Sequence, residues 1–229
     1  PARFGEARAL WFTRVLHVAA VALLAGAGVA AGTGALYFVG VGVCAAVLTL
    51  ASTSLYAEES GPSRPFFGQM VLQGVTFQVE SPNDSSINPV TVRAMVDGKT
   101  FAEEGMEADG TITGLEVEDL NADGYPEVYV YVTSAGSGSY GSLIAYASNR
   151  NRSITPIYLP PLEDDPAAAK GYMGHDRFVV GEGALVRNFP IYKDGDTNAA
   201  PTGGTRQLQY HLQAGEAGWL LVPYKVFDF

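Results

Sequence analysis

The hydrophobic and polar positions follow two different patterns along the sequence. Between Arg14 and Glu58 lie 43 consecutive residues without Asp, Glu, Lys or Arg, whereas beyond Pro65 short apolar runs alternate with polar positions. An uncharged stretch of this length is typical of a membrane-directed segment, and a period of two is typical of half-buried β-strands. The change of pattern predicts a hydrophobic segment at 1–57, a linker at 58–65 and a folded domain at 66–229.

The hydrophobic segment at 1–57 has three interpretations. Arginines precede its uncharged part at positions 3, 8 and 14, so this end is expected on the cytoplasmic side. One apolar helix that ends in small residues would be a signal peptide cleaved after Ala57, or a retained membrane anchor. Two spans, at 10–31 and 35–56, would instead return the domain to the cytoplasm. We expect export to the periplasm or cell envelope, with an N-terminal hydrophobic helix that is removed or kept as an anchor.

The domain at 66–229 has the pattern of an all-β protein. Val128, Val130 and Val132 alternate with Tyr129 and Tyr131, and similar short runs recur along the domain. Pairs of turn-forming residues separate many of these runs, and such pairs favour tight connections between antiparallel strands. We therefore predict an antiparallel β-sandwich. The turn pairs are Asp97-Gly98, Asp109-Gly110, Asp123-Gly124, Asp194-Gly195 and Gly203-Gly204.

Composition adds a strong charge asymmetry. Residues 58–229 contain 23 acidic and 11 basic side chains, a formal net charge of −12, in a chain whose total is −10. Such a surface repels phosphate backbones, so nucleic-acid binding is not expected and a basic partner is favoured. The single cysteine, Cys44, lies in the hydrophobic segment, so the domain can form neither an internal disulfide nor a thiolate metal site.

An acidic turn precedes the Val128–Val132 run. Asp119, Asn121, Asp123 and Glu127 occupy the first, third, fifth and ninth positions of a calcium-loop pattern, with Gly124 at the sixth. The bidentate Glu of an EF-hand is missing, because Val130 stands at the twelfth position, and the flanking runs are strands rather than helices. An Asx turn, in which these side chains accept backbone hydrogen bonds, is the favoured interpretation. A Ca²⁺ site formed by the four oxygen-bearing residues remains the alternative.

A loop rich in glycine and serine follows the same run. Its Gly136, Gly138 and Gly141 satisfy a dinucleotide-binding pattern, but no helix and no suitably placed acid follow them, so we interpret the match as accidental. Glycines permit unusual backbone angles, serines offer hydrogen bonds, and a tyrosine supplies a contact surface at low entropic cost. We therefore predict an exposed hairpin loop that binds a partner. Its candidate residues are Ser134, Gly136, Ser137, Gly138, Ser139, Tyr140 and Gly141.

The run from Glu118 to Ala147 resembles the central part of the periplasmic inhibitors of invertebrate-type lysozyme, in which an acidic turn, a hydrophobic strand and a Ser/Gly/Tyr loop follow one another. The resemblance implies an antiparallel β-sandwich whose loop enters the active-site cleft of the lysozyme. Carried over by match, Ser137 and Tyr140 are the contact residues. The segment from Gly171 to Phe229 lies outside the resemblance.

The sequence gives little support for an enzyme. His175 and His211 have no metal-ligand spacing and no nucleophile motif beside them, so a hydrolase is the least supported hypothesis. Asp194, Asp196 and Asn198 favour an ordinary turn over a second metal site. We predict a non-enzymatic lysozyme-binding protein with no cofactor apart from the Ca²⁺ alternative, and membrane contact only through residues 1–57. The competing hypothesis is a calcium-stabilised envelope or adhesion module.

Overall fold

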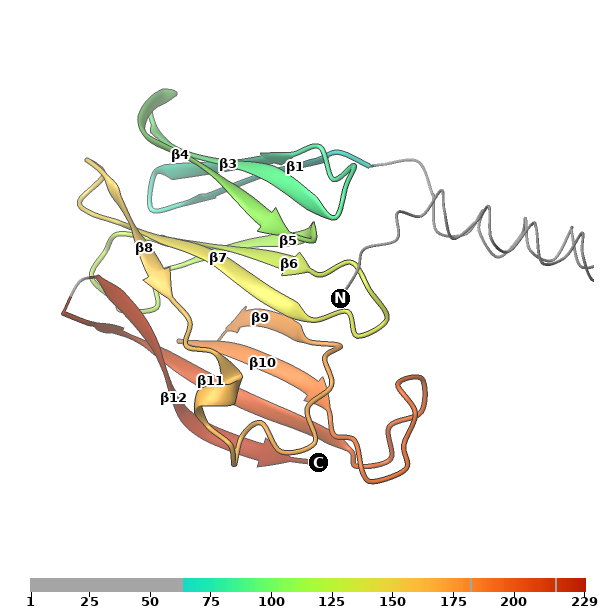
Figure 1. The fold of residues 1–229 in the computed structure, drawn as a ribbon. Coiled ribbons are helices and arrows are strands. Elements are labelled where there is room, and N and C mark those ends of the chain that lie inside the picture. Colours follow the sequence, from blue (N-terminus) through green and yellow to red (C-terminus); the bar gives the residue numbers. More distant parts are fainter. Residues whose placement is uncertain (1–63, 182, 217) are drawn as a thin grey trace, which may run out of the picture. The chain divides into compact units, whose positions relative to one another are not determined.

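The computed structural model divides the chain into two compact units, Pro1–Pro62 and Ser63–Phe229. It describes residues 64–229 except 182 and 217, and Figure 1 draws this part in colour. The predicted hydrophobic segment at 1–57, its helix and most of the linker therefore lie outside the described residues. Within those residues, no helix has both the length and the apolar character needed to cross a membrane.

The described part consists of strands joined by turns and loops, with one short 3-10 helix, η1 (Leu162–Asp164). The all-β class predicted from the alternation is confirmed. The strands are β1 (Phe66–Leu72), β2 (Val75–Ser81), β3 (Ile87–Val96), β4 (Lys99–Asp109), β5 (Thr111–Glu118), β6 (Glu127–Thr133), β7 (Gly141–Ser148), β8 (Ile154–Tyr158), β9 (Arg177–Gly181), β10 (Ala184–Pro190), β11 (Thr205–Ala214) and β12 (Trp219–Asp228).

Strands β1 to β4 form an antiparallel sheet in sequence order. Its buried side chains, among them Phe77 and Val92, belong to one core with Val128, Val130 and Val132 of β6. Burying an aliphatic side chain completely contributes about 1.5–3 kcal/mol, so this cluster is a major source of stability. It fixes the four-stranded sheet against the face of β6 that carries the valines.

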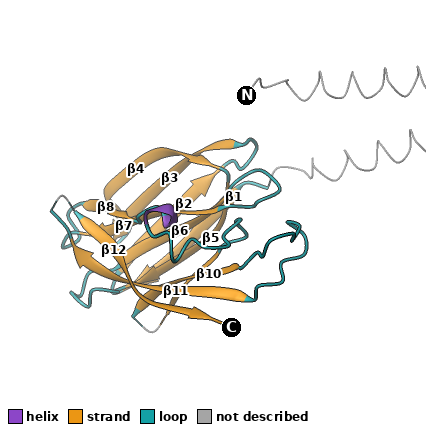
Figure 2. Ribbon diagram, turned by 60° about the horizontal axis from the view of Figure 1, so that its bottom comes forward, coloured by secondary structure: helices purple, strands orange, loops and turns teal. Residues whose placement is uncertain are grey.

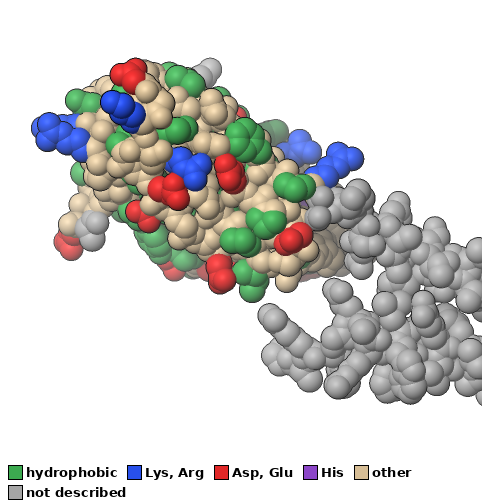
Figure 3. Space-filling view, turned by 90° about the horizontal axis from the view of Figure 1, so that it is seen from above, with side chains coloured by type: hydrophobic (Ala, Val, Ile, Leu, Met, Phe, Trp, Pro, Cys, Tyr) green, Lys and Arg blue, Asp and Glu red, His purple; other side chains and the backbone are tan. Residues whose placement is uncertain are grey.

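The outer side of the four-stranded sheet remains open to solvent. On β1, Phe67 and Val71 are 63% and 62% exposed. Figure 3, which views the molecule from above, shows hydrophobic, acidic and basic side chains interspersed on this side. The acidic excess of the domain therefore does not form a patch of one sign here.

The other strands form an eight-stranded sheet in the order β5-β6-β7-β8-β12-β11-β10-β9. All neighbours are antiparallel except β8 and β12, which run parallel. The two edge strands approach each other. The backbone N–H of Val180 on β9 donates a 2.6 Å hydrogen bond to Glu116 Oε2 on β5. The rings of Tyr131 and Phe178 stack nearby, with centroids 5.9 Å apart. Figures 1 and 2 show how the sheet curves round.

This curvature corrects the predicted sandwich. The eight-stranded sheet is barrel-like, because accumulated strand twist brings its two edges together around a second core. Alternation along a strand identifies buried positions, but it does not reveal whether the two edges of a sheet meet. The buried residues of this second core include Tyr129, Ala145, Ile157, Leu185, Phe189, Leu208 and Leu221.

Strand β6 belongs to both cores. Val128, Val130 and Val132 face the four-stranded sheet, whereas Tyr129 belongs to the core of the barrel-like sheet and Tyr131 packs against it. The strand is thus fixed from both sides, which makes it a rigid support for the segments at its ends. The acidic turn leads into its first residue and the Ser134–Gly141 loop follows its last, about 20 Å away at roughly 3.3 Å per residue.

Candidate functional site

The loop that connects β6 to β7, Ser134–Gly141, has an exposed tip and a hydrogen-bonded base. Ala135, Gly136 and Ser137 are exposed. At the base, the Ser134 N–H donates to the Tyr140 carbonyl over 2.9 Å, and the Tyr140 N–H donates to Ser134 Oγ over 3.0 Å. The predicted loop residues therefore form one closed hairpin connection whose tip is exposed to solvent.

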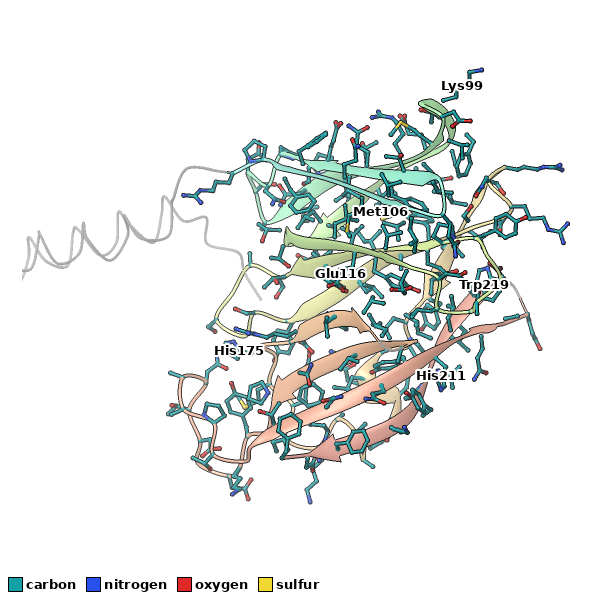
Figure 4. The ribbon with its side chains drawn as sticks, turned by 180° about the vertical axis from the view of Figure 1, so that it is seen from behind. Lys99, Met106, Glu116, His175, His211 and Trp219 are labelled. Carbon is teal, nitrogen blue, oxygen red and sulfur yellow. The ribbon has the colours of Figure 1, made fainter. Side chains whose placement is uncertain are left out.

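A segment distant in sequence supports the loop from one side. The His175 N–H donates to the carbonyl of Gly138 over 2.8 Å, and Asn198 Nδ2 donates to the carbonyl of Ser137. The His175 ring nitrogen Nε2 lies 3.1 Å from Asn198 Oδ1, so the two supporting residues also contact each other. Figure 4 shows His175 at the end of the molecule where these loops gather. His175 is thus a supporting residue of the loop.

The Tyr140 ring lies on the outside of this assembly and is 48% exposed. One of its sides covers Gly138, where an added Cβ would come within 2.3 Å of the ring. Its edge meets the Tyr172 ring at a centroid distance of 5.6 Å. Tyr140 is therefore held in place by aromatic packing while half of its surface remains free for contact.

A buried ion pair fixes the base of the loop. Arg187 Nε donates to Asp176 Oδ1 over 2.7 Å, and the two side chains are 6% and 0% exposed. Asp176 Oδ2 accepts bonds from the Gly141 N–H at 2.8 Å and from the Tyr172 hydroxyl at 2.6 Å. Arg187 Nη2 also donates to the Tyr172 hydroxyl over 2.9 Å. One carboxylate thus joins the start of β7 to the aromatic residue behind Tyr140.

The ion pair is electrostatically balanced. Burial alone lowers the pKa of Arg187, but the charge and hydrogen bond of Asp176, together with the nearby Tyr172 and Tyr210, outweigh this effect, and the pKa lies above its ordinary value. Both groups make several hydrogen bonds, which is the condition under which a buried pair is tolerated. The network is therefore a fixed structural element of the loop.

A cavity of about 360 Å³ opens beside the loop base. Its walls come from β5, β6 and the segment around Asp176, so it adjoins the network just described. Polar and aromatic groups share the lining, which includes Thr113, Tyr131, Thr133, Gly141, Asp176 and Phe178.

At the other end of β6, the acidic turn forms the side-chain bonds predicted for an Asx turn. Asp119 accepts from the N–H groups of Asp123 at 3.1 Å and Gly124 at 2.9 Å. Asn121 Oδ1 accepts from the Asp123 N–H at 2.9 Å, and Asp123 Oδ1 accepts from the Tyr125 N–H at 2.8 Å. The turn is therefore ordered by its own oxygens, which point inward.

Glu127 follows this turn as the first residue of β6 and is completely buried. Its Oε2 accepts a 2.8 Å bond from the Leu120 N–H, whereas Oε1 has no partner among the described residues. Burial above all, and the nearby carboxylates of Asp119 and Asp123, raise the pKa of Glu127 from 4.5 to about 8. One carboxylate oxygen from each of these three residues lies within 4.8 Å of the others.

The remaining candidates from the sequence lie elsewhere. His211 stacks on Tyr224 at a centroid distance of 3.6 Å, away from the loop. Asp196 accepts bonds from the N–H groups of Lys193 and Thr202, which is the ordinary turn that was favoured over a metal site.

Sequence reasoning missed the supporting network. Tyr172, Asp176 and Arg187 lie in the segment that the resemblance did not cover. A signal was nevertheless present, because Arg187 lies between Leu185 and Phe189 on the same face of a predicted strand. A charge on an apolar face implies a buried partner.

Comparison with models of known protein families and with curated proteins finds no match for this chain. The function must therefore be argued from the geometry and chemistry of the site.

Proposed function

We propose that the domain is an exported protein that inhibits a lysozyme, in particular one of the invertebrate type, by placing the Ser134–Gly141 loop in its active-site cleft. The observation that carries the proposal is the combination of an exposed, uncharged tip with a base fixed by buried groups. A loop of this kind is already ordered before it meets a partner. Its function then depends on occupancy and requires no catalytic residue.

Order in the free protein favours tight binding. Association loses affinity when side chains and loops must become ordered at the interface. Here the Asp176–Arg187 pair, the His175 and Asn198 contacts and the packing of Tyr140 on Tyr172 supply that order in advance. Tyr140 then presents a large, stiff contact surface, which is a common property of binding anchors.

The chemistry of the tip suits a glycosidase cleft. Such clefts contain two carboxyl groups that act on the glycosidic bond. The hydroxyls of Ser137 and Tyr140 can donate to carboxylates without bringing a repelling negative charge to them. The acidic remainder of the domain, at −12 over residues 58–229, would attract a basic lysozyme from a distance.

Export is part of the proposal. The expected signal peptide or anchor at 1–57 would bring the domain to the periplasm or cell envelope, where lysozymes attack. Retention by an anchor and release by cleavage are both compatible with the proposed inhibition.

An inhibition assay tests the proposal. The purified protein is titrated into lysozymes of the invertebrate type and of other classes, and we expect stoichiometric loss of activity with the invertebrate type. The double variant Ser137→Ala/Tyr140→Ala should weaken binding by about 30-fold or more, because loss of a central aromatic anchor typically costs about 2 kcal/mol or more.

The matched control is Tyr158→Ala. Tyr158 on β8 is also an exposed tyrosine, at 57%, but lies outside the loop. This variant should inhibit like the wild type. Full inhibition by the loop double variant would exclude the loop from the mechanism, and failure of the wild type against every lysozyme class would overturn the proposed function.

A further inference from the structure

We propose that the Asp119–Glu127 turn is a binding site for a divalent cation, specifically Ca²⁺, separate from the loop at the other end of β6. The first observation is geometric. Carboxylate oxygens of Asp119, Asp123 and Glu127 lie within 4.8 Å of one another, a spacing at which one ion can touch all three. Asn121 Oδ1 belongs to the same turn and contacts the Asp123 N–H.

The second observation concerns Glu127 alone. Its side chain is completely buried, and its Oε1 has no hydrogen-bond partner within the described part of the chain. A buried carboxylate oxygen without a partner is strongly unfavourable, and most such atoms in folded proteins are paired. Here the carboxylate lies close to two others, so a cation is the partner that would satisfy Oε1 and contact all three residues.

The strand that follows the turn explains why the glutamate stands at the ninth position of the calcium-loop pattern and not at the twelfth. In an EF-hand the chain continues into a helix, and the Glu at position twelve returns to the ion. Here the chain enters β6 directly, so Val130 at position twelve is buried in the core shared with the four-stranded sheet. Glu127, the first residue of β6, is the carboxylate that faces the turn.

The donor set selects the type of ion. Three carboxylates and one amide oxygen are hard ligands, and no histidine or cysteine belongs to the cluster. Ca²⁺ takes roughly six to eight oxygens in flexible geometry, so backbone carbonyls or water would complete its shell. Mg²⁺ requires a stricter octahedron and gives up water reluctantly, which makes it the poorer fit.

Bound Ca²⁺ would fix the turn to two parts of the fold. Glu127 anchors the turn to β6, and Gln73 Nε2, from the turn between β1 and β2, donates a 2.8 Å bond to Asp119 Oδ2. The ion would therefore stabilise the contact between the two sheets near this end of β6. This expectation does not depend on the proposed inhibition of a lysozyme.

Terbium luminescence provides a direct test on the purified full chain. Tb³⁺ is a substitute for Ca²⁺, and Tyr129, whose hydroxyl lies 3.4 Å from Glu127 Oε2, is close enough to sensitise it. We expect tyrosine-excited Tb³⁺ emission that Ca²⁺ displaces at concentrations where Mg²⁺ does not. Ca²⁺ should also raise the Tm of the protein treated with chelator, by several degrees.

Variants distinguish binding at this turn from a general effect of removing acidic side chains. Asp119→Asn, Asp123→Asn and Glu127→Gln should each abolish the emission and the Ca²⁺-dependent rise in Tm. Glu127→Gln keeps the shape of the side chain and cannot ionise, so it is expected to fold. The control Asp97→Asn changes an acidic residue in another Asp-Gly turn and should behave like the wild type.

Three results would overturn the proposal. They are a Tm and an emission that do not respond to Ca²⁺, an unchanged response in Glu127→Gln, and a response lost equally in Asp97→Asn. Equal displacement by Mg²⁺ would overturn the assignment to Ca²⁺.

Discussion

Single glycines show how closely the supporting segment fits the Ser134–Gly141 loop. Gly174 has φ +93°, and an added Cβ would lie 2.0 Å from the Gly138 carbonyl oxygen. Both the backbone angle and the contact exclude a side chain, and a backbone atom cannot move aside without shifting the loop. The loop and its support are therefore complementary at the level of individual atoms.

This fit leads to a stability prediction. Gly174→Ala should lower the free energy of unfolding by more than about 1 kcal/mol, as for other alanines forced into a positive-φ position. Urea denaturation monitored by tyrosine fluorescence measures the change. Gly105→Ala on β4 is the control, because its Cβ would meet nothing within 4 Å and its φ is ordinary for any residue. Equal stability of the two variants would show that the tight contact is absent in solution.

At the scale of elements, the Asp176–Arg187 pair joins the base of the loop to β7, to β10 and to the segment before β9. Asp176 immediately precedes β9, and Arg187 points inward from the middle of β10. The carboxylate also receives the N–H of Gly141, the first residue of β7. Disturbing this pair should therefore affect both folding and the position of the loop.

We predict that Asp176→Asn and Arg187→Met each destabilise the domain by about 3–5 kcal/mol, because each leaves its partner charged, buried and unpaired. Urea denaturation measures the loss. The control is Glu103→Gln, which removes an exposed partner of Arg93 and should cost less than about 1 kcal/mol. Losses for the buried pair as small as for Glu103→Gln would show that solvent reaches Asp176 and Arg187.

The same elements show what could be predicted from the sequence. The alternation of valine and tyrosine at 128–132 predicted β6 and which side chains share a face, because a strand places successive side chains on opposite sides. The Asp-Gly pair at 97–98 predicted the turn between β3 and β4, where both residues have positive φ. These features depend on local conformation, which neighbouring residues determine.

Contacts between distant segments were not predictable in this way. The parallel pairing of β8 with β12 and the approach of β9 to β5 join segments about 60 residues apart, and no local pattern encodes them. The support of the loop by His175 and Asn198 is of the same kind. Sequence therefore identified the candidate loop, but not the residues that fix its shape.

At the scale of the whole molecule, the proposed function assigns long-range attraction and specific contact to different parts of the domain. The candidate loop contains no charged residue, whereas residues 58–229 have a formal net charge of −12. Long-range attraction acts mainly on the rate of encounter, and short-range contacts act mainly on the rate of dissociation. The two contributions can therefore be separated by kinetics.

We predict that the association rate constant with a basic lysozyme falls about tenfold or more between low salt and 0.5 M salt, because ions screen exposed charges over about 10 Å at 0.1 M. Dissociation should change little over the same range. The loop variant Ser137→Ala/Tyr140→Ala should show the opposite behaviour, with faster dissociation and an unchanged dependence of association on salt. Stopped-flow mixing at several salt concentrations measures both rates. Association that is insensitive to salt would mean that the acidic surface does not guide the partner, and the negative charge would then need a different explanation, such as attraction of the divalent cation to the acidic turn.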